Sequence, residues 1–308
     1  SHLSQVRILY ALIAMKILLI IFLTFFSKNV FSEINTIYLN STYLNKSIEI
    51  NANHYTNSRA NNTAAISIHG TRGFKTMEIV SALSDNLLGL NIDTIAPNIS
   101  YGINNRNDSF LTCDINHHHN RHANINEIVR WFSYAIGKDY KNIILIGHSR
   151  GGQDVLNAYK KILEVYPTES KKISSIVLLA PLTDNVDDIN DHLQKSNNST
   201  MNQLLNMDGD SLIEMNFLNC SNAKVKISSF LSYYNLARQD ETIQILKDIK
   251  ISTNVFTASE DAFVPKTHSK IAKINNSYIN LVQVQGSDHF FRDLFLDEVI
   301  EILSELIE

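Results

Sequence analysis

Six short segments rich in apolar residues are the strongest signal in the chain. The segments between them carry apolar residues at the three-to-four spacing of an amphipathic helix. A strand that is apolar throughout is buried on both faces, which is typical of a parallel sheet covered by helices. The pattern therefore predicts an α/β fold with a mostly parallel central sheet and helices on both faces. The predicted buried strands are residues 64–68, 92–95, 143–146, 173–180, 255–258 and 279–284.

The remaining segments predict helices, one edge strand and loops. Residues 48–54 alternate well enough for an edge strand, and the polar residues 56–62 that follow indicate a turn. Pro97 is expected to stop the strand over 92–95, and residues 98–124 lack periodicity and indicate a long polar loop. Helices are expected from the loop at 69–73 to about residue 88, over 125–136, from 150 to about 165, over 267–274 and over 290–307.

An insertion separates two of the predicted strands, 173–180 and 255–258. It begins with a polar stretch over residues 183–202 and becomes amphipathic over residues 212–249. This placement predicts an inserted helical cap over about residues 183–250.

The N-terminal 32 residues have the order of a targeting segment. Lys16 is followed by an apolar stretch over residues 17–26, and Val30 and Ser32 suit the positions that signal peptidase inspects. We therefore expect residues 1–32 to be a signal peptide. The alternative joins residues 8–26 into a membrane anchor interrupted by Lys16. Either interpretation predicts an exported protein, periplasmic or secreted, with membrane association through this segment in the second case.

Length and composition favour one large domain over residues 33–308. The chain has 308 residues, 44% of them hydrophobic, which is enough for a single core. Its formal net charge is −4, and it has no basic run of the kind that follows phosphates. We therefore expect no nucleic-acid partner.

A glycine-rich motif follows the apolar run 143–146 and precedes a predicted helix. It reads Gly147-His148-Ser149-Arg150-Gly151-Gly152. A strand that turns at once into a helix forces its corner residue, Ser149, into a strained conformation and exposes its hydroxyl. The amide of Arg150, at the start of the helix, would point toward negative charge that develops there.

Three features of the sequence together resemble the α/β-hydrolase fold family. Residues 147–151 resemble its nucleophile elbow, and residues 69–73, His-Gly-Thr-Arg-Gly, resemble its oxyanion loop. Asp261 and His289 follow the last two predicted strands, in the family's chain order of serine, acid and histidine. The resemblance implies a catalytic triad of Ser149, Asp261 and His289, with the backbone amides of Thr71 and Arg150 as the oxyanion hole. Glu260 and Asp184 are alternative positions for the acid.

The chemistry of these residue types agrees with that assignment. A serine hydroxyl needs a base to accept its proton, and a histidine with a pKa near 6.5 is suited to that task. An aspartate would hold the imidazole in the correct tautomer. The resemblance implies a carboxylic ester hydrolase that acts through an acyl-enzyme on a small-molecule or lipid ester and needs no metal or organic cofactor. The alternatives are a lipase, thioesterase or amidase with the same triad, and a non-catalytic binding protein on this fold.

Several histidines lie close to the predicted site. Residues 117–122 contain four histidines after Cys113-Asp114, and histidine and carboxylate are zinc ligands. Consecutive histidines do not easily converge on one ion, so we expect no metal here. We predict that His117 and His119 face the substrate from a loop above the site, and that His69 and His148, beside the two motifs, do the same.

The chain has two cysteines, Cys113 and Cys220. They could form one bridge in an oxidising compartment, or remain as two buried thiols. Cys113 is not expected to be a nucleophile, because no strand-to-helix corner exposes it.

Overall fold

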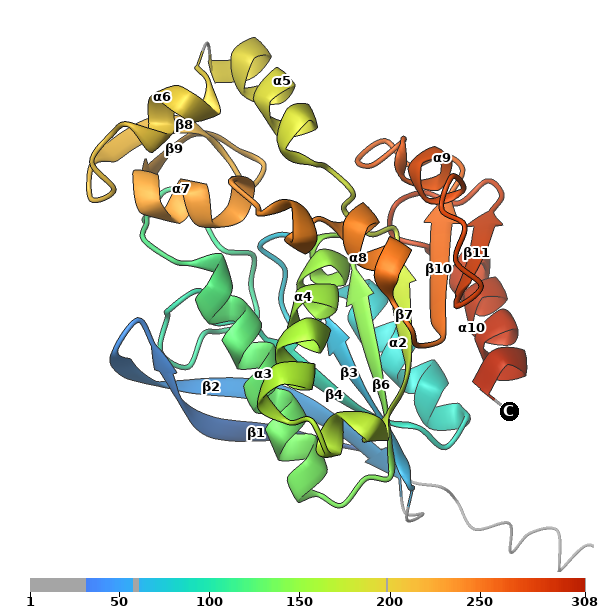
Figure 1. Ribbon diagram of the computed structural model, residues 1–308. Coiled ribbons are helices and arrows are strands. Elements are labelled where there is room, and N and C mark those ends of the chain that lie inside the picture. The colour runs from blue at the N-terminus through green and yellow to red at the C-terminus, as the bar shows by residue number, and fades with distance from the viewer. Residues whose placement is uncertain (1–31, 58–60, 198, 308) are drawn as a thin grey trace, which may run out of the picture.

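The described part of the chain is built on an eight-stranded sheet with the strand order β1-β2-β4-β3-β6-β7-β10-β11 (Figure 1). A computed structural model describes residues 32–57, 61–197 and 199–307. The predicted signal peptide or anchor lies outside these ranges except for Ser32, which begins β1. Within the described ranges, no helix has both the length and the apolar character needed to cross a bilayer.

The strands from β4 to β11 in this order form one parallel sheet. Each of the six predicted buried strands corresponds to one of its strands, which confirms the predicted mostly parallel sheet. The strands are Thr63–Ile68 (β3), Asp93–Asn98 (β4), Asn142–His148 (β6), Ile173–Leu179 (β7), Thr253–Ala258 (β10) and Ile279–Val284 (β11).

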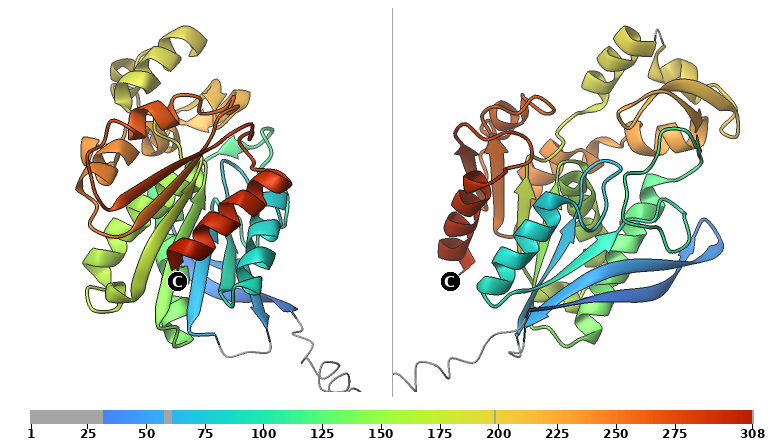
Figure 2. Two further views of the ribbon diagram at one scale, coloured as in Figure 1. Left: turned by 90° about the vertical axis from the view of Figure 1, so that its right-hand side faces the viewer. Right: turned by 180° about the vertical axis from the view of Figure 1, so that it is seen from behind.

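Helices cover both faces of the sheet, as Figure 2 shows from the side and from behind. Helices α3 (Arg121–Gly137), α4 (Arg150–Val165) and α8 (Thr242–Asp248) pack on one apolar core, and α2 (Glu78–Gly89) and α10 (Leu294–Ile307) pack on the other. Along β6, Leu145 belongs to the first core and Ile144 and Ile146 to the second. Both faces of the strand are therefore buried, which explains its unbroken apolar sequence. The short elements Glu169–Lys172 (η1) and Thr267–Ile271 (α9) complete the body.

The N-terminal part of the sheet is a long antiparallel hairpin of β1 (Ser32–Tyr43) and β2 (Lys46–Asn57). The prediction of an edge strand over 48–54 was wrong in position, because β2 lies between β1 and β4 and β1 forms the edge. Residues 56 and 57, expected in a turn, belong to β2. Most of β1 is exposed and polar, so it lacks the apolar alternation by which a strand is detected.

Pro97 does not stop the fourth strand, contrary to the prediction. It lies inside β4 and opposes Ala52 of β2. The ladder between β4 and β3 ends at the Ile66–Ile95 pair, two residues before the proline. The missing N–H of Pro97 therefore leaves no gap in that ladder.

The cap lies between β7 and β10, above the carboxyl ends of the parallel strands (Figure 1). It contains helices, as predicted, and also a hairpin that the sequence pattern did not indicate. The hairpin pairs with the two-residue strand β5 of the loop before α3, which gives a second, three-stranded sheet among the residues described. Helix α8, although within residues 183–250, packs in the core of the body. The cap elements are Val186–Asn197 (α5), Met201–Leu205 (α6), Leu212–Phe217 (β8), Cys220–Lys226 (β9), Ile227–Tyr234 (α7) and Arg238–Asp240 (η2), and β5 is Asn116–His117.

A disulfide joins the cap to the body. Cys113, in the loop before α3, is bonded to Cys220 at the start of β9. Of the two alternatives left open by the sequence, the structure has the bridge.

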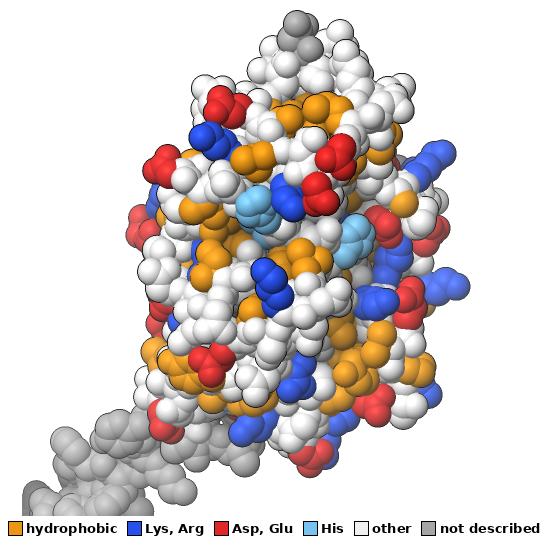
Figure 3. All heavy atoms as spheres, turned by 90° about the vertical axis from the view of Figure 1, so that its left-hand side faces the viewer, with side chains coloured by type: hydrophobic (Ala, Val, Ile, Leu, Met, Phe, Trp, Pro, Cys, Tyr) orange, Lys and Arg blue, Asp and Glu red, His pale blue; other side chains and the backbone are white. Residues whose placement is uncertain are grey.

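The face that Figure 3 shows carries lysine, arginine and acidic side chains interspersed with small apolar areas.

Candidate active site

Ser149 occupies the corner between β6 and α4 in a strained conformation, with φ 56° and ψ −122°. Its amide donates to the carbonyl of Leu179 at 2.8 Å, which fixes the corner against β7. Glycine is required at both flanking positions. A Cβ on Gly147 would collide with the backbone of Gly151, and one on Gly151 would lie 2.5 Å from the carbonyl oxygen of Ile68. The elbow thus forms because the backbones of β3, β6 and α4 approach closely here.

A buried hydrogen bond connects His289 to Asp261. Nδ1 of His289 lies 2.8 Å from Oδ2 of Asp261, and both side chains are less than 5% exposed. The other carboxylate oxygen accepts the amides of Phe263 and Val264, each at 2.8 Å. Burial alone would raise the pKa of Asp261, but the hydrogen bonds from His289 and from these amides outweigh it and hold the pKa below its usual value. The carboxylate is therefore ionised at neutral pH, and Nδ1 of His289 donates to it.

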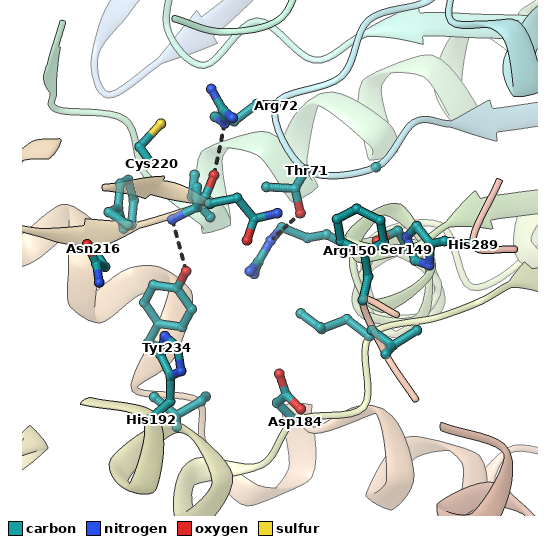
Figure 4. A pocket seen from close by; sticks show the side chains of 18 of the residues that line it. Thr71, Arg72, Ser149, Arg150, Asp184, His192, Asn216, Cys220, Tyr234 and His289 are labelled. Atoms are coloured by element: carbon teal, nitrogen blue, oxygen red, sulfur yellow. Dashed lines mark hydrogen bonds between the residues drawn. The ribbon is translucent and has the colours of Figure 1, made fainter. Parts of the chain in front are cut away.

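Ser149 and His289 line one cavity of about 660 Å³ between the sheet and the cap. Figure 4 shows both at the same end of it, with Arg150 reaching toward the middle. The opposite wall comes from the cap and includes His192, Asn216 and Tyr234.

The loop after β3 lies directly beside Ser149. A Cβ on Gly70 would be 3.1 Å from Cβ of Ser149, and the next residue, Thr71, lines the cavity. The loop is closed by a hydrogen bond of 3.0 Å from the amide of Gly73 to the carbonyl of Gly70. Arg150 is the first residue of α4, where an amide has no acceptor within the helix. Both predicted oxyanion positions, Thr71 and Arg150, thus border the end of the cavity that holds Ser149.

Comparison with known proteins identifies the fold. No protein-family model matches the sequence, and no similar sequence was found among curated proteins. Est1E from Butyrivibrio proteoclasticus matches with a TM-score of 0.60 and 16% identity, over 88% of this chain and 97% of that one. The alpha/beta hydrolase GrgF from Penicillium sp. sh18 gives 0.59 and 13%, over 89% and 96%. The chain has the α/β-hydrolase fold. The Pyrococcus furiosus esterase PF2001 also shares it, with a TM-score of 0.52 and 13% identity over 88% of this chain and 90% of that one.

The alternative acids have other partners. Asp184 lies 3.8 Å from Lys270, and Glu260 accepts a long hydrogen bond of 3.4 Å from the hydroxyl of Ser259. Asp288, next to His289 in the chain, pairs with Arg292 at 2.7 Å. Of the acids considered from the sequence, Asp261 is the one that contacts the imidazole. Its position after β10 follows the order of acid and histidine loops in the α/β-hydrolase fold.

His69 does not face the substrate, contrary to the prediction. It is 2% exposed, its Nδ1 donates to the carbonyl of Gly70 at 2.9 Å, and its Nε2 accepts the amide of Ile99 at 3.1 Å. Burial lowers its pKa to about 3, so the ring is neutral. His69 therefore holds the loop that carries Thr71.

His148 lines the cavity, and one of its ring nitrogens is already hydrogen-bonded. Nε2 lies 2.9 Å from the backbone carbonyl of His289 and donates to it. Burial, together with the nearby His289, lowers the pKa of His148 to about 3, so it stays neutral. Its clearest role is to join the elbow to the histidine loop.

His117 and His119 do not face the substrate either. Nδ1 of His117 lies 3.0 Å from Nε2 of His119, whose Nδ1 lies 2.7 Å from the hydroxyl of Tyr233 in α7. Both rings are buried against Phe217 of β8 and are absent from the cavity wall. The prediction that they face the substrate was wrong because the cap covers them, which local polarity does not reveal. Among the residues that the structure describes, no three His, Cys, Asp or Glu side chains form a group that could hold a metal ion.

The cap residues of the cavity wall were missed by sequence reasoning. His192, Asn216 and Tyr234 come from three separate cap elements, and no motif marks them. The sequence did mark Arg150, because it directly follows the nucleophile position. No sequence pattern marked Tyr233 and Tyr234, the cap residues that it contacts.

Proposed function

We propose that this protein is a serine hydrolase that cleaves carboxylic esters through an acyl-enzyme on Ser149. The observation that carries the proposal is the buried Asp261–His289 hydrogen bond beside a cavity that Ser149 also lines. An oriented imidazole next to a strained serine corner is the arrangement that nucleophilic catalysis needs. The esterase named among the structures of this fold gives further support.

The mechanism follows from the positions of the donors and acceptors. His289 takes the proton of Ser149 as the hydroxyl attacks the ester carbonyl, and Asp261 stabilises the imidazolium. The amides of Thr71 and Arg150 bind the oxyanion, and one such donor is typically worth about 3 to 4 kcal/mol. His289 then gives the proton to the departing alcohol. Water activated by the same histidine releases the acid and restores Ser149.

The substrate of the proposal has an apolar part. A second groove of about 250 Å³ adjoins the cavity and shares Met77, Phe110 and Phe290 with it. Its remaining wall includes Phe74 and Phe291, which suits an alkyl or aryl group. Est1E, of the same fold, has been solved with ferulic acid, an aromatic acid, bound. A small or lipid-like ester with such a group fits the groove.

Export remains part of the proposal. The Cys113–Cys220 bridge supports it, because disulfides persist mainly in oxidising compartments. On this view residues 33–308 function in the periplasm or outside the cell, and the N-terminal segment supplies any membrane association.

Hydrolysis of p-nitrophenyl esters of increasing acyl length tests the proposal. We expect turnover by the purified protein and a loss of about 10³-fold or more in the Ser149→Ala variant. Equal turnover by the variant would refute the assignment of Ser149. If the protein cleaves no ester, thioester or amide substrate, the result would favour the alternative of a non-catalytic binding protein with this fold.

A further inference from the structure

Arg150 brings a positive charge without a counterion into the wall of the cavity. The residue is 7% exposed and lines the cavity beside Ser149. Its Nε donates to Oγ1 of Thr71 at 3.3 Å, whereas Nη1 is buried and meets no acceptor in the described part of the chain. A buried guanidinium with an unused donor is costly to maintain unless something pairs with it.

The carboxylates of the cavity wall are already paired. Asp184 and Asp188 line the cavity, but they lie 3.8 and 2.7 Å from Lys270 of α9. Asp154, one turn further along α4, pairs with Arg121 at 2.7 Å. No described acid is within ion-pair distance of Arg150. Its positive charge is therefore available to a bound group.

The other arginine of the wall is not equivalent. Nε of Arg72 donates to the carbonyl of Leu218 and Nη1 to that of Leu111, each at 2.8 Å. The bond to Leu218 holds the loop after β3 to the cap, and the bond to Leu111 holds it to the loop before α3. Nε and Nη1 of Arg72 are therefore engaged, whereas Nη1 of Arg150 has no partner among the described residues.

Two aromatic rings of the cap hold the Arg150 side chain in place. The guanidinium carbon is 5.6 Å from the ring centre of Tyr233 and 5.4 Å from that of Tyr234, both in α7. Cation–π contacts fix such a group but do not neutralise its charge. Figure 4 shows the side chain extending from the elbow toward Thr71, between Ser149 and the cap wall.

We infer that Arg150 binds a carboxylate of the substrate, so that the esters cleaved are those of dicarboxylic acids or of alcohols that carry a carboxyl group. The inference rests on the proposed ester hydrolysis and names its substrate class. A planar guanidinium binds carboxylate through two parallel hydrogen bonds, which a neutral group of the same shape does not form. The carboxylate also supplies the counterion that Arg150 lacks.

Two matched pairs of esters test the inference on the whole protein. The first pair is mono-4-nitrophenyl adipate and 4-nitrophenyl 6-methylheptanoate, in which an isopropyl end replaces the carboxylate. The second is 4-acetoxybenzoate and 4-isopropylphenyl acetate, which place the charge on the alcohol side. For each ester, kcat/KM is divided by the rate constant of its hydrolysis by hydroxide. The readout is the ratio of this normalised value for the charged ester to that for the neutral ester of the pair. A general loss of activity cancels in this ratio.

Wild-type protein should prefer the charged member of at least one pair by roughly ten- to a hundredfold, the value of a hydrogen bond to a charged group. Arg150→Met should bring that ratio close to one, and Arg150→Lys should keep part of it. Arg130→Met, which removes an exposed arginine of α3 remote from the cavity, should keep the wild-type ratio. A wild-type ratio of one or less in both pairs, or a ratio unchanged in Arg150→Met, would overturn the inference. If no ester of either pair is cleaved above the level of Ser149→Ala, the proposed function fails as well.

Discussion

Nδ1 of His289 lies 2.8 Å from Oδ2 of Asp261, although 28 residues separate them in the chain. Asp261 follows β10 and His289 follows β11, and these strands are parallel neighbours. Their carboxyl ends meet at the edge of the sheet that carries Ser149. The hydrogen bond leaves Nε2 as the ring nitrogen that can accept a proton.

Replacing Asp261 by asparagine should lower kcat by roughly 10³- to 10⁴-fold, because the imidazole loses both its correct tautomer and its stabilising charge. KM should change much less. Initial rates with a p-nitrophenyl ester measure the effect. Glu260→Gln is the matched control, since the carboxylate of Glu260 accepts from Ser259 and that of Asp261 from His289, and it should keep nearly full activity. Comparable activity in the two variants would show that Asp261 does not orient the base.

Asp261 should also make stability depend on acid pH. Its pKa is lowered in the folded protein, so its contribution is present above the unfolded value, near 3.9, and is lost as the pH falls through the folded value. The free energy of unfolding of wild type should exceed that of Asp261→Asn most at neutral pH, and the difference should shrink below about pH 4. Urea denaturation at several pH values measures it. Asp139→Asn, which removes an exposed partner of Lys141, should show little difference at any pH. A difference in the free energy of unfolding between wild type and Asp261→Asn that grows toward acid pH would contradict the account.

The disulfide between the cap and the body should stabilise the folded protein. Cys113 and Cys220 are 107 residues apart, so the bridge closes a long loop, and its loss should cost about 2 to 5 kcal/mol. The double variant Cys113→Ser, Cys220→Ser should therefore melt at a lower temperature than wild type. Wild type treated with a reductant should approach the variant, whereas the variant itself should not respond. Equal melting temperatures without reductant would mean that the bridge adds no stability.

Gly151 should not tolerate a side chain. The added Cβ would lie 2.5 Å from the carbonyl oxygens of Ile68 and His69 and would push α4 away from β3. Gly151→Ala should lose about 1 to 3 kcal/mol of stability and, by moving Thr71 relative to Ser149, should lower kcat. Gly137→Ala is the matched control, because a Cβ there meets nothing within 4 Å at the end of α3. Thermal melting and initial rates of both variants give the comparison, and an active, stable Gly151→Ala protein would contradict it.

The parallel sheet could be predicted because burial on both faces leaves an unbroken apolar run. Residues 143–146 are buried within β6, and their sequence alone indicates it. β1 could not be predicted in the same way, since most of its side chains face solvent. The hairpin β8–β9 was missed because part of it is polar and exposed, and its pairing with residues 116–117 is distant in sequence.

In the candidate site, too, the residues with a local sequence pattern could be predicted, and those whose surroundings depend on distant residues could not. The elbow and the loops after β3, β10 and β11 have local patterns, because each needs glycine or a charged residue at a strand end. The burial of His117 and His119 depends on Phe217 and Tyr233 of the cap, more than 90 residues further along. A polar sequence does not reveal such cover. The unpaired state of Arg150 likewise follows from the partners of Asp184 and Asp188, which only the folded protein defines.

Labelling with a fluorophosphonate tests the central claim most directly. The probe phosphonylates a serine that an oriented histidine activates. Mass spectrometry of the folded protein should find one adduct, located on Ser149 by peptide mapping, and none on the Ser149→Ala variant or on protein unfolded before treatment. A folded wild-type protein without an adduct, or an equal adduct on Ser149→Ala, would contradict the account.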